Sequence, residues 1–210
     1  MSSPIPATGS HRHEVRDRLL RAALDLVNTQ GIQNFTQARV AAAAGVRQSH
    51  LTYYFPTRND LLKALVQEGT AEFRDHIGAE LTDGPDALKR LRSAFAERSS
   101  GCAMPRLMIA LTVASEEDAS LKRWLEEMER NVITRLSDVF ARFGVQASPD
   151  DLMLFHVSLI GAAMIRLGSD NEQSTHRARQ VVLHAFDNLV TQSRGAAPVP
   201  SDPRVRHVPS

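Results

Sequence analysis

The stretch from Phe35 to Arg58, FTQARVAAAAGVRQSHLTYYFPTR, decides the fold of this chain. It begins with Thr36, whose hydroxyl can accept a hydrogen bond from an unpaired N–H group in the first turn of a helix. The short helix that follows is expected to end at Gly45, because glycine adopts the left-handed conformation that stops a helix within one residue. Val46 then provides an apolar anchor, so a tight turn is predicted there.

A second short helix is predicted over about residues 47–53 or 54, with Leu51 and Tyr54 facing inward. The small side chain of Ala41 lets the two helices approach, Gly45 makes the corner, and Leu51 fills the wedge between them. This spacing is typical of a helix-turn-helix unit, whose second helix enters the major groove of DNA.

The residues after the second helix make the pattern specific. Gly45-Val46, Leu51 and the run YFPTRNDLL from Tyr54 to Leu62 resemble the signature of TetR-family transcriptional regulators. The resemblance is strongest from about Arg16 to Leu65. It implies an all-α protein with an N-terminal three-helix DNA-binding domain, a larger helical ligand-binding and dimerisation domain, and a small-molecule inducer. It also implies a phosphate contact at Thr52, where the family usually has tyrosine.

Composition places the chain among ordinary globular proteins, with 42% hydrophobic and 23% charged residues. Cys102 is the only cysteine, which excludes a disulfide framework or a cysteine zinc site and fits a reducing cytoplasm. The first ten residues lack the pattern of a secretory signal. The most apolar stretch, Leu152 to Leu167, is interrupted by polar residues and is expected to be too short to span a membrane. We therefore expect a cytoplasmic protein.

The net charge of +1 conceals an asymmetry along the chain. Residues 1–60 contain seven arginines and no lysine against four acidic side chains, a net charge of +3, which leaves −2 for the rest. Arginine is the side chain best suited to forked contacts with phosphate and guanine. Together with the helix-turn-helix pattern, this charge predicts a nucleic-acid face near the N-terminus.

The predicted domains are a disordered arm over residues 1–10, the helix-turn-helix domain over 11–57, the effector-binding and dimerisation domain over 58–193, and a disordered tail over 194–210. The first helix is expected to start near residues 11–14 and to end at about Gln30. Later helices are expected over about 58–81, 85–100, 104–115, 121–143, 149–167 and 175–193.

The candidate DNA contacts lie on and around the second short helix. Arg47 is expected to contact a guanine edge and Gln48 an adenine, each giving about 1–3 kcal/mol of discrimination if bidentate. Arg58 is expected to contact phosphate, so that its loss weakens binding to all duplexes alike. The alternative is a merely solvated helix face, with Tyr54 in the core. The full candidate set is Thr36, Arg47, Gln48, Ser49, His50, Thr52, Tyr53, Tyr54 and Arg58.

The candidate effector site lies at the centre of the second domain. Adaptable thioethers beside an indole ring suit a cavity for an apolar or aromatic effector, although ordinary core packing is the alternative for each residue. The candidates are Phe95, Met104, Met108, Trp124 and Met128. His156 is expected to be a core or interface histidine, and the carboxylates at 116–118 are expected to favour a helix N-terminus rather than to hold a metal.

The last two predicted helices are apolar on more than one face. A helix of this kind must be buried on more than one face, so we expect these helices to pair with their copies in a two-fold four-helix bundle. The predicted dimer interface comprises Leu152, Phe155, Leu159, Ala163, Val182, Phe186 and Leu189.

An enzyme is the competing class of protein. The sequence contains no HExxH, GxSxG or P-loop motif, so catalysis, a metal and a cofactor are not expected. The sequence therefore predicts a homodimeric repressor that a small apolar or aromatic effector releases from a palindromic DNA operator. An activator, or a regulator controlled by a protein partner, remains an alternative.

Overall fold

The structure is a computed structural model that describes residues 8–80, 84, 86–98, 103–169 and 171–195. Within these residues the chain forms helices and no strand, which confirms the predicted all-α fold. The elements are α1 (Thr8–Gln30), the 3-10 turn η1 (Ile32–Asn34), α2 (Gln37–Ala43), α3 (Gln48–Tyr54), α4 (Arg58–Glu80), α5 (Ala87–Arg98), α6 (Ala103–Ala114), α7 (Ala119–Ala141), α8 (Pro149–Gly168) and α9 (Glu172–Gly195).

The helix boundaries differ from the predicted ones mainly at the chain ends. Helix α1 begins at Thr8, so residues 8–10 of the predicted disordered arm are helical, and α9 extends two residues into the predicted tail. The rest of the arm and the tail lies outside the described residues. The turn η1 was not predicted, because three residues carry too little periodicity to identify a 3-10 helix.

The turn between α2 and α3 has the geometry that the sequence predicts. Gly45 has a φ of 66°, and its N–H donates to the carbonyl of Ala42 at 3.1 Å. The N–H of Val46 donates to the carbonyl of Ala41 at 3.0 Å. These two bonds form a Schellman motif, which satisfies the last carbonyls of α2. Leu51 is completely buried beneath the turn.

We expect Gly45→Ala to lower the free energy of unfolding by about 1–2 kcal/mol, because an L side chain disfavours the left-handed backbone conformation. Nothing lies within 4 Å of a Cβ at this position, so the loss would come from the backbone alone. Urea denaturation measures the change. Gly78→Ala is the matched control, since Gly78 is a helical glycine with equally open surroundings. Equal stability of Gly45→Ala and wild type would contradict this interpretation of the turn.

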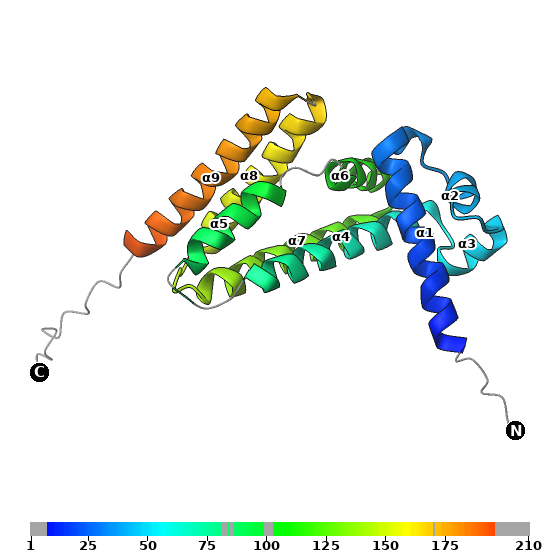
Figure 1. The fold of residues 1–210 in the computed structure, drawn as a ribbon, viewed down its shortest axis with the longest axis horizontal. Coiled ribbons are helices and arrows are strands. Elements are labelled where there is room, and N and C mark those ends of the chain that lie inside the picture. The colour runs from blue at the N-terminus through cyan, green and yellow to red at the C-terminus, as the bar shows by residue number, and fades with distance from the viewer. Residues whose placement is uncertain (1–7, 81–83, 85, 99–102, 170, 196–210) are drawn as a thin grey trace, which may run out of the picture.

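Two hydrophobic cores lie along the elongated molecule, and α4 belongs to both (Figure 1). The DNA-side core comprises the buried residues of α1–α3 and of the first half of α4, together with Leu107 and Leu111 of α6 and Leu121 of α7. The distal core comprises Ile77 of α4 and the buried residues of α5, α8, α9 and the second half of α7. The predicted domain boundary at residues 57 and 58 thus coincides with the start of α4, but the core does not divide there.

Four phenylalanine rings form the centre of the distal core. Phe95, Phe140, Phe155 and Phe186 come from four different helices, each is at most 2% exposed, and their ring centroids lie 5.2–6.2 Å apart. Stacked and edge-to-face contacts of this kind add to the free energy of burial. This cluster fixes α8 and α9 against α5 and α7 within one chain.

Five of the seven predicted dimer-interface residues are buried inside a single protomer, where a second copy cannot reach them. Their side chains cover the chain's own α5, α6 and α7, which leaves the opposite faces of α8 and α9 to solvent. The most buried, at 0–3% exposed, are Leu152, Phe155, Val182, Phe186 and Leu189. Leu159 and Ala163 are half-buried and line a large cavity that opens to solvent.

The apolar side chains that α8 and α9 leave exposed form a different set. Leu154, Val157 and Ile165 follow one stripe of α8, and Val181 of α9 is also exposed. Contrary to the sequence expectation, α8 is long and apolar enough to cross a membrane by length and composition alone. A single helix of this kind is equally typical of the core of a globular protein, and α8 packs along α9 (Figure 1).

Candidate DNA-binding surface and effector cavity

The first turn of α3 presents a continuous polar surface. Arg47, Gln48, Ser49 and His50 are all exposed. Arg47 is the N-cap residue but makes no side-chain capping bond, so its guanidinium is not used at the helix start. Leu51 on the opposite face anchors the helix in the core. The arrangement offers four adjacent hydrogen-bonding side chains to the edges of bases in a groove.

The far end of α3 is held by α1. The Tyr53 ring is 63% exposed, and its hydroxyl accepts a 2.6 Å hydrogen bond from Arg12 Nη2, with the guanidinium 5.6 Å from the ring centroid. Tyr54 is half-buried and packs edge-on against Tyr53 at 5.2 Å. The Thr52 hydroxyl donates to the carbonyl of Ser49 at 3.1 Å. Sequence reasoning missed Arg12, and its only signal was the run of arginines in α1.

Two further candidates already have partners within the domain. Thr36 caps α2 as predicted, since its hydroxyl oxygen accepts from the N–H of Arg39 at 3.3 Å. Arg58 Nε donates to the carbonyl of Phe35 at 3.2 Å, and the guanidinium lies 5.7 Å from the Phe35 ring. Burial lowers the pKa of Arg58 from its ordinary value. Both side chains hold the domain together, so any contact they make to phosphate is an additional role.

A second arginine of α1 connects the end of α3 to α4. The Arg16 guanidinium lies 6.0 Å from the centroid of the Phe55 ring, directly after α3. Arg16 Nη1 also lies 3.9 Å from a carboxylate oxygen of Glu68 in α4. The carbonyl of Phe55 accepts a 2.7 Å hydrogen bond from Gln37 of α2. Phe55 is thus the point where α1, α2 and α4 meet the recognition helix.

A cavity of about 1080 Å³ lies between α1, α4, α5, α6, α7 and α8. Four of the five predicted effector residues line it: Phe95, Met104, Met108 and Met128. Trp124 does not line it; it lies one turn earlier on α7 and packs against the DNA-side core. Met164 of α8 also lines the cavity, and the sequence analysis did not assign it.

Polar groups interrupt the apolar wall at a few places. His156 of α8 lines the cavity, and burial lowers its pKa, opposed by the nearby charge of Glu129. Its imidazole is therefore neutral at pH 7. This partly buried position is consistent with the expected core histidine, which here also lines the cavity. No group of three His, Cys, Asp or Glu residues in the described part of the chain is arranged to hold a metal ion.

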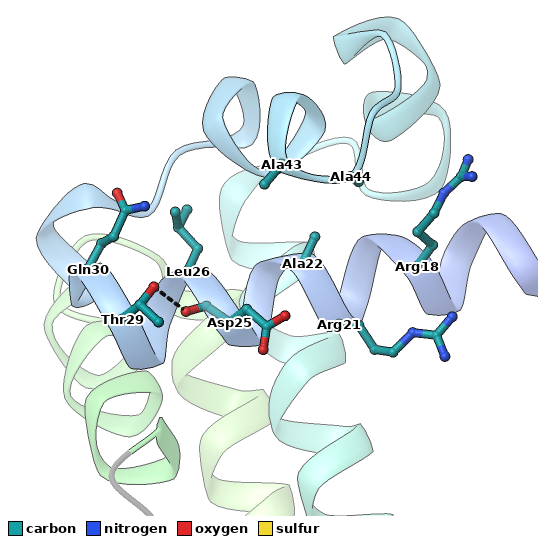
Figure 2. Close-up of a pocket in the computed structure, with 9 residues that line it drawn as sticks. All are labelled: Arg18, Arg21, Ala22, Asp25, Leu26, Thr29, Gln30, Ala43 and Ala44. Carbon is teal, nitrogen blue, oxygen red and sulfur yellow. Dashed lines mark hydrogen bonds between the residues drawn. The ribbon is translucent and has the colours of Figure 1, made fainter.

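A smaller hollow of about 420 Å³ lies beside α1 in the DNA-binding domain. Figure 2 shows Ala22 and Leu26 of α1 facing Ala43 and Ala44 at the end of α2, with Arg18 at one edge. The small alanine side chains allow the two helices to pack closely and leave this space above them. The hollow thus follows from helix packing within the domain.

A Schellman turn between two short helices, an exposed recognition helix and a second helical region with a large cavity define a DNA-binding transcriptional regulator. The sequence model of the family described as bacterial regulatory proteins, tetR family, matches residues 19–65. This part of the chain therefore resembles the TetR family.

Known relatives extend this match beyond the first domain. The HTH-type transcriptional regulator BetI of Klebsiella pneumoniae (strain 342) is 29% identical over 133 residues, which cover 60% of this chain and 68% of BetI. A TetR transcription regulator from Haloarcula marismortui has a TM-score of 0.68 at 18% identity, over 84% of this chain and 98% of that one. The multidrug binding protein EbrR, solved with imidazole, has a TM-score of 0.61 at 23% identity, over 96% and 100%. The two structures show the shared fold.

Proposed function

We propose that this DNA-binding regulator is a homodimeric repressor that leaves a near-palindromic operator when a small molecule enters its cavity. The observation that carries the proposal is the make-up of the cavity wall, which includes α1 and α4 as well as α5–α8. Since α1 and α4 also hold the recognition helix through Phe55, a ligand there acts on the helices that position α3. A protein that works on DNA in this way is expected in the cytoplasm.

Dimerisation is supported by the apolar stripe on α8 and α9. Leu154, Val157 and Ile165 lie on one face of α8, and Gly161 between them leaves open space where a Cβ would be. An exposed apolar stripe with a small residue at its centre suits close packing against a two-fold copy. The hairpin lies at the opposite end of the molecule from α3 (Figure 1). A dimer through it would present two recognition helices to half-sites about 34–36 Å apart, or a multiple.

The effector is expected to act by shifting a population. A ligand that binds one arrangement of α1 and α4 better than the other favours that arrangement by its differential affinity. Useful release of DNA requires a difference of a few kcal/mol. A regulator controlled by a protein partner would need no cavity of this size, which favours the small-molecule proposal.

The first experiment is selection of bound duplexes from a random pool by the full-length protein at two salt concentrations. A two-fold symmetric motif that persists at the higher salt is the expected result, because base contacts survive the screening that removes phosphate attraction. That duplex then serves to screen small molecules for DNA release. Enrichment of no motif at either salt would contradict operator recognition by the free protein.

A glycine in the cavity wall provides a test of where an effector binds. A Cβ at Gly69 of α4 would lie 2.7 Å from the terminal methyl of Met104, which would have to move. We expect Gly69→Ala to weaken the affinity of any effector found in the screen. Unliganded DNA affinity should stay within about two-fold of wild type, because the clash is with the end of a flexible side chain that borders the cavity and can move. Titration calorimetry measures the effector, and Gly78→Ala on the same helix is the control. Equal effector affinity in both variants would place the effector elsewhere.

A further inference from the structure

Acidic side chains outnumber basic ones among the described residues of the cavity wall. Four carboxylates line it, from α1, α4 and α5, against one guanidinium and the neutral His156. The charged residues are Asp17, Glu68, Glu72, Glu97 and Arg21. The described residues of the wall therefore carry a formal charge of −3 at pH 7, and Arg16 lies 3.9 Å from two of these carboxylates, those of Asp17 and Glu68.

The rest of the wall is apolar and adaptable. Four of the six methionines of the chain line the cavity, namely Met104, Met108, Met128 and Met164. Unbranched thioether side chains adapt to ligands of irregular shape. A negative field above an apolar surface attracts a ligand with a positive charge and an apolar body, and repels an anion of the same shape.

One carboxylate of this wall has a second partner on the DNA side. Glu68 faces the cavity and also lies 3.9 Å from Arg16, whose guanidinium packs on Phe55 at the end of the recognition helix. The Arg16 and Glu68 side chains are 37% and 49% exposed, so the pair is weak and a competing cation can replace Arg16.

We infer that the effector is an amphipathic organic cation that binds Glu68 in competition with Arg16. This inference rests on the proposed function of the cavity. When the ligand takes over Glu68, Arg16 loses its partner on α4 and keeps only Asp17 of its own helix. The buried side chains of α1 and α4 stay packed, but the position of Arg16 on Phe55 is free to change. The recognition helix then changes its angle to α4, and the two helices of a dimer no longer match one operator.

Tetraphenylphosphonium and tetraphenylborate provide a matched test, because the two ions have the same shape and opposite charge. Full-length protein is titrated with each ion by calorimetry in potassium-free buffer, and release of the selected duplex is followed by fluorescence anisotropy. We expect the phosphonium to bind at least about ten-fold more tightly than the borate and to release DNA, since like charge opposes the borate.

Glu68→Gln then tests the coupling, with Glu127→Gln as the control. Glu127 lies on the exposed face of α7 and does not line the cavity. We expect Glu68→Gln to weaken phosphonium binding about five-fold, the size of effect expected when a partly exposed charge pair is lost. Phosphonium should also lower the DNA affinity of this variant by a smaller factor than it lowers that of the wild type. Glu127→Gln should change neither quantity.

The outcomes separate this inference from the function on which it rests. Borate binding as tight as phosphonium binding, or no binding of either ion, would overturn the cationic class. Normal coupling in Glu68→Gln would overturn the role of Glu68. In each case, release of the same duplex by neutral compounds in the screen would still support control of DNA binding by a small molecule. Failure of every compound to release it would count against that function itself.

Discussion

Val157→Glu in α8 is expected to convert the dimer into monomers and to weaken operator binding by about 100-fold or more, because two linked recognition helices gain 10²–10⁴ in affinity over one. Val157 is 53% exposed in the single chain, at the centre of the apolar stripe. In a two-fold dimer through this stripe the new carboxylate would be buried near the same carboxylate of the second protomer. An unpaired buried charge opposes association strongly.

Sedimentation equilibrium measures the oligomeric state, and fluorescence anisotropy with the selected duplex measures DNA affinity. Asn131→Glu in α7 is the matched control, since Asn131 is exposed and lies outside both the α8–α9 hairpin and the cavity wall. It introduces the same charge at another exposed position and should leave the dimer intact. A Val157→Glu protein that remains dimeric would show that the interface lies on another face.

Arg47→Ala is expected to flatten the sequence preference of the protein without abolishing its attraction to DNA. Loss of a bidentate guanine contact lowers discrimination by about 1–3 kcal/mol, or about five- to 150-fold, at one base pair of each half-site. Non-specific affinity should fall only slightly, because the remaining arginines still attract phosphate. Repeating the duplex selection with the variant shows which base pair loses its preference.

Arg58→Ala is the contrasting variant. It should weaken binding to all duplexes alike, with a salt slope smaller by about one if the guanidinium also contacts phosphate. Since Arg58 holds Phe35, its urea denaturation must be recorded beside the binding data. Identical selection profiles for the two variants would contradict the assignment of base reading to Arg47.

The local features of the fold could be predicted from the sequence because they depend on neighbouring residues. The cap at Thr36, the left-handed Gly45 and the buried Leu51 each follow from a propensity that acts within one or two turns. The exposed surface at Arg47–His50 follows from the same reasoning. Four of the five proposed cavity residues were also found, since methionines gather where helices leave irregular space.

The features that could not be predicted depend on which helix covers which. Periodicity shows that α8 has more than one apolar face, but not whether Phe155 or Val157 faces the protomer's own core. The structure buries Phe155 and exposes Val157. Arg12 meets Tyr53 across 41 residues of sequence, and Arg16 meets Glu68 across a similar distance, so no local pattern connects them. Trp124 was misplaced for the same reason.

Helix α4 belongs to both cores, and α6 packs in the DNA-side core although it comes after residue 58 in the sequence. This packing limits which part of the chain could be exchanged with that of a relative. A chimera that joined another DNA-binding domain to this chain at residue 58 would leave Leu107, Leu111 and Leu121 facing a surface they were not selected to fit. Mismatched side chains in such a core leave voids or clashes. The smallest unit that can be transplanted with its packing intact is therefore α1–α4 together with α6 and the start of α7, a unit that is discontinuous in the sequence.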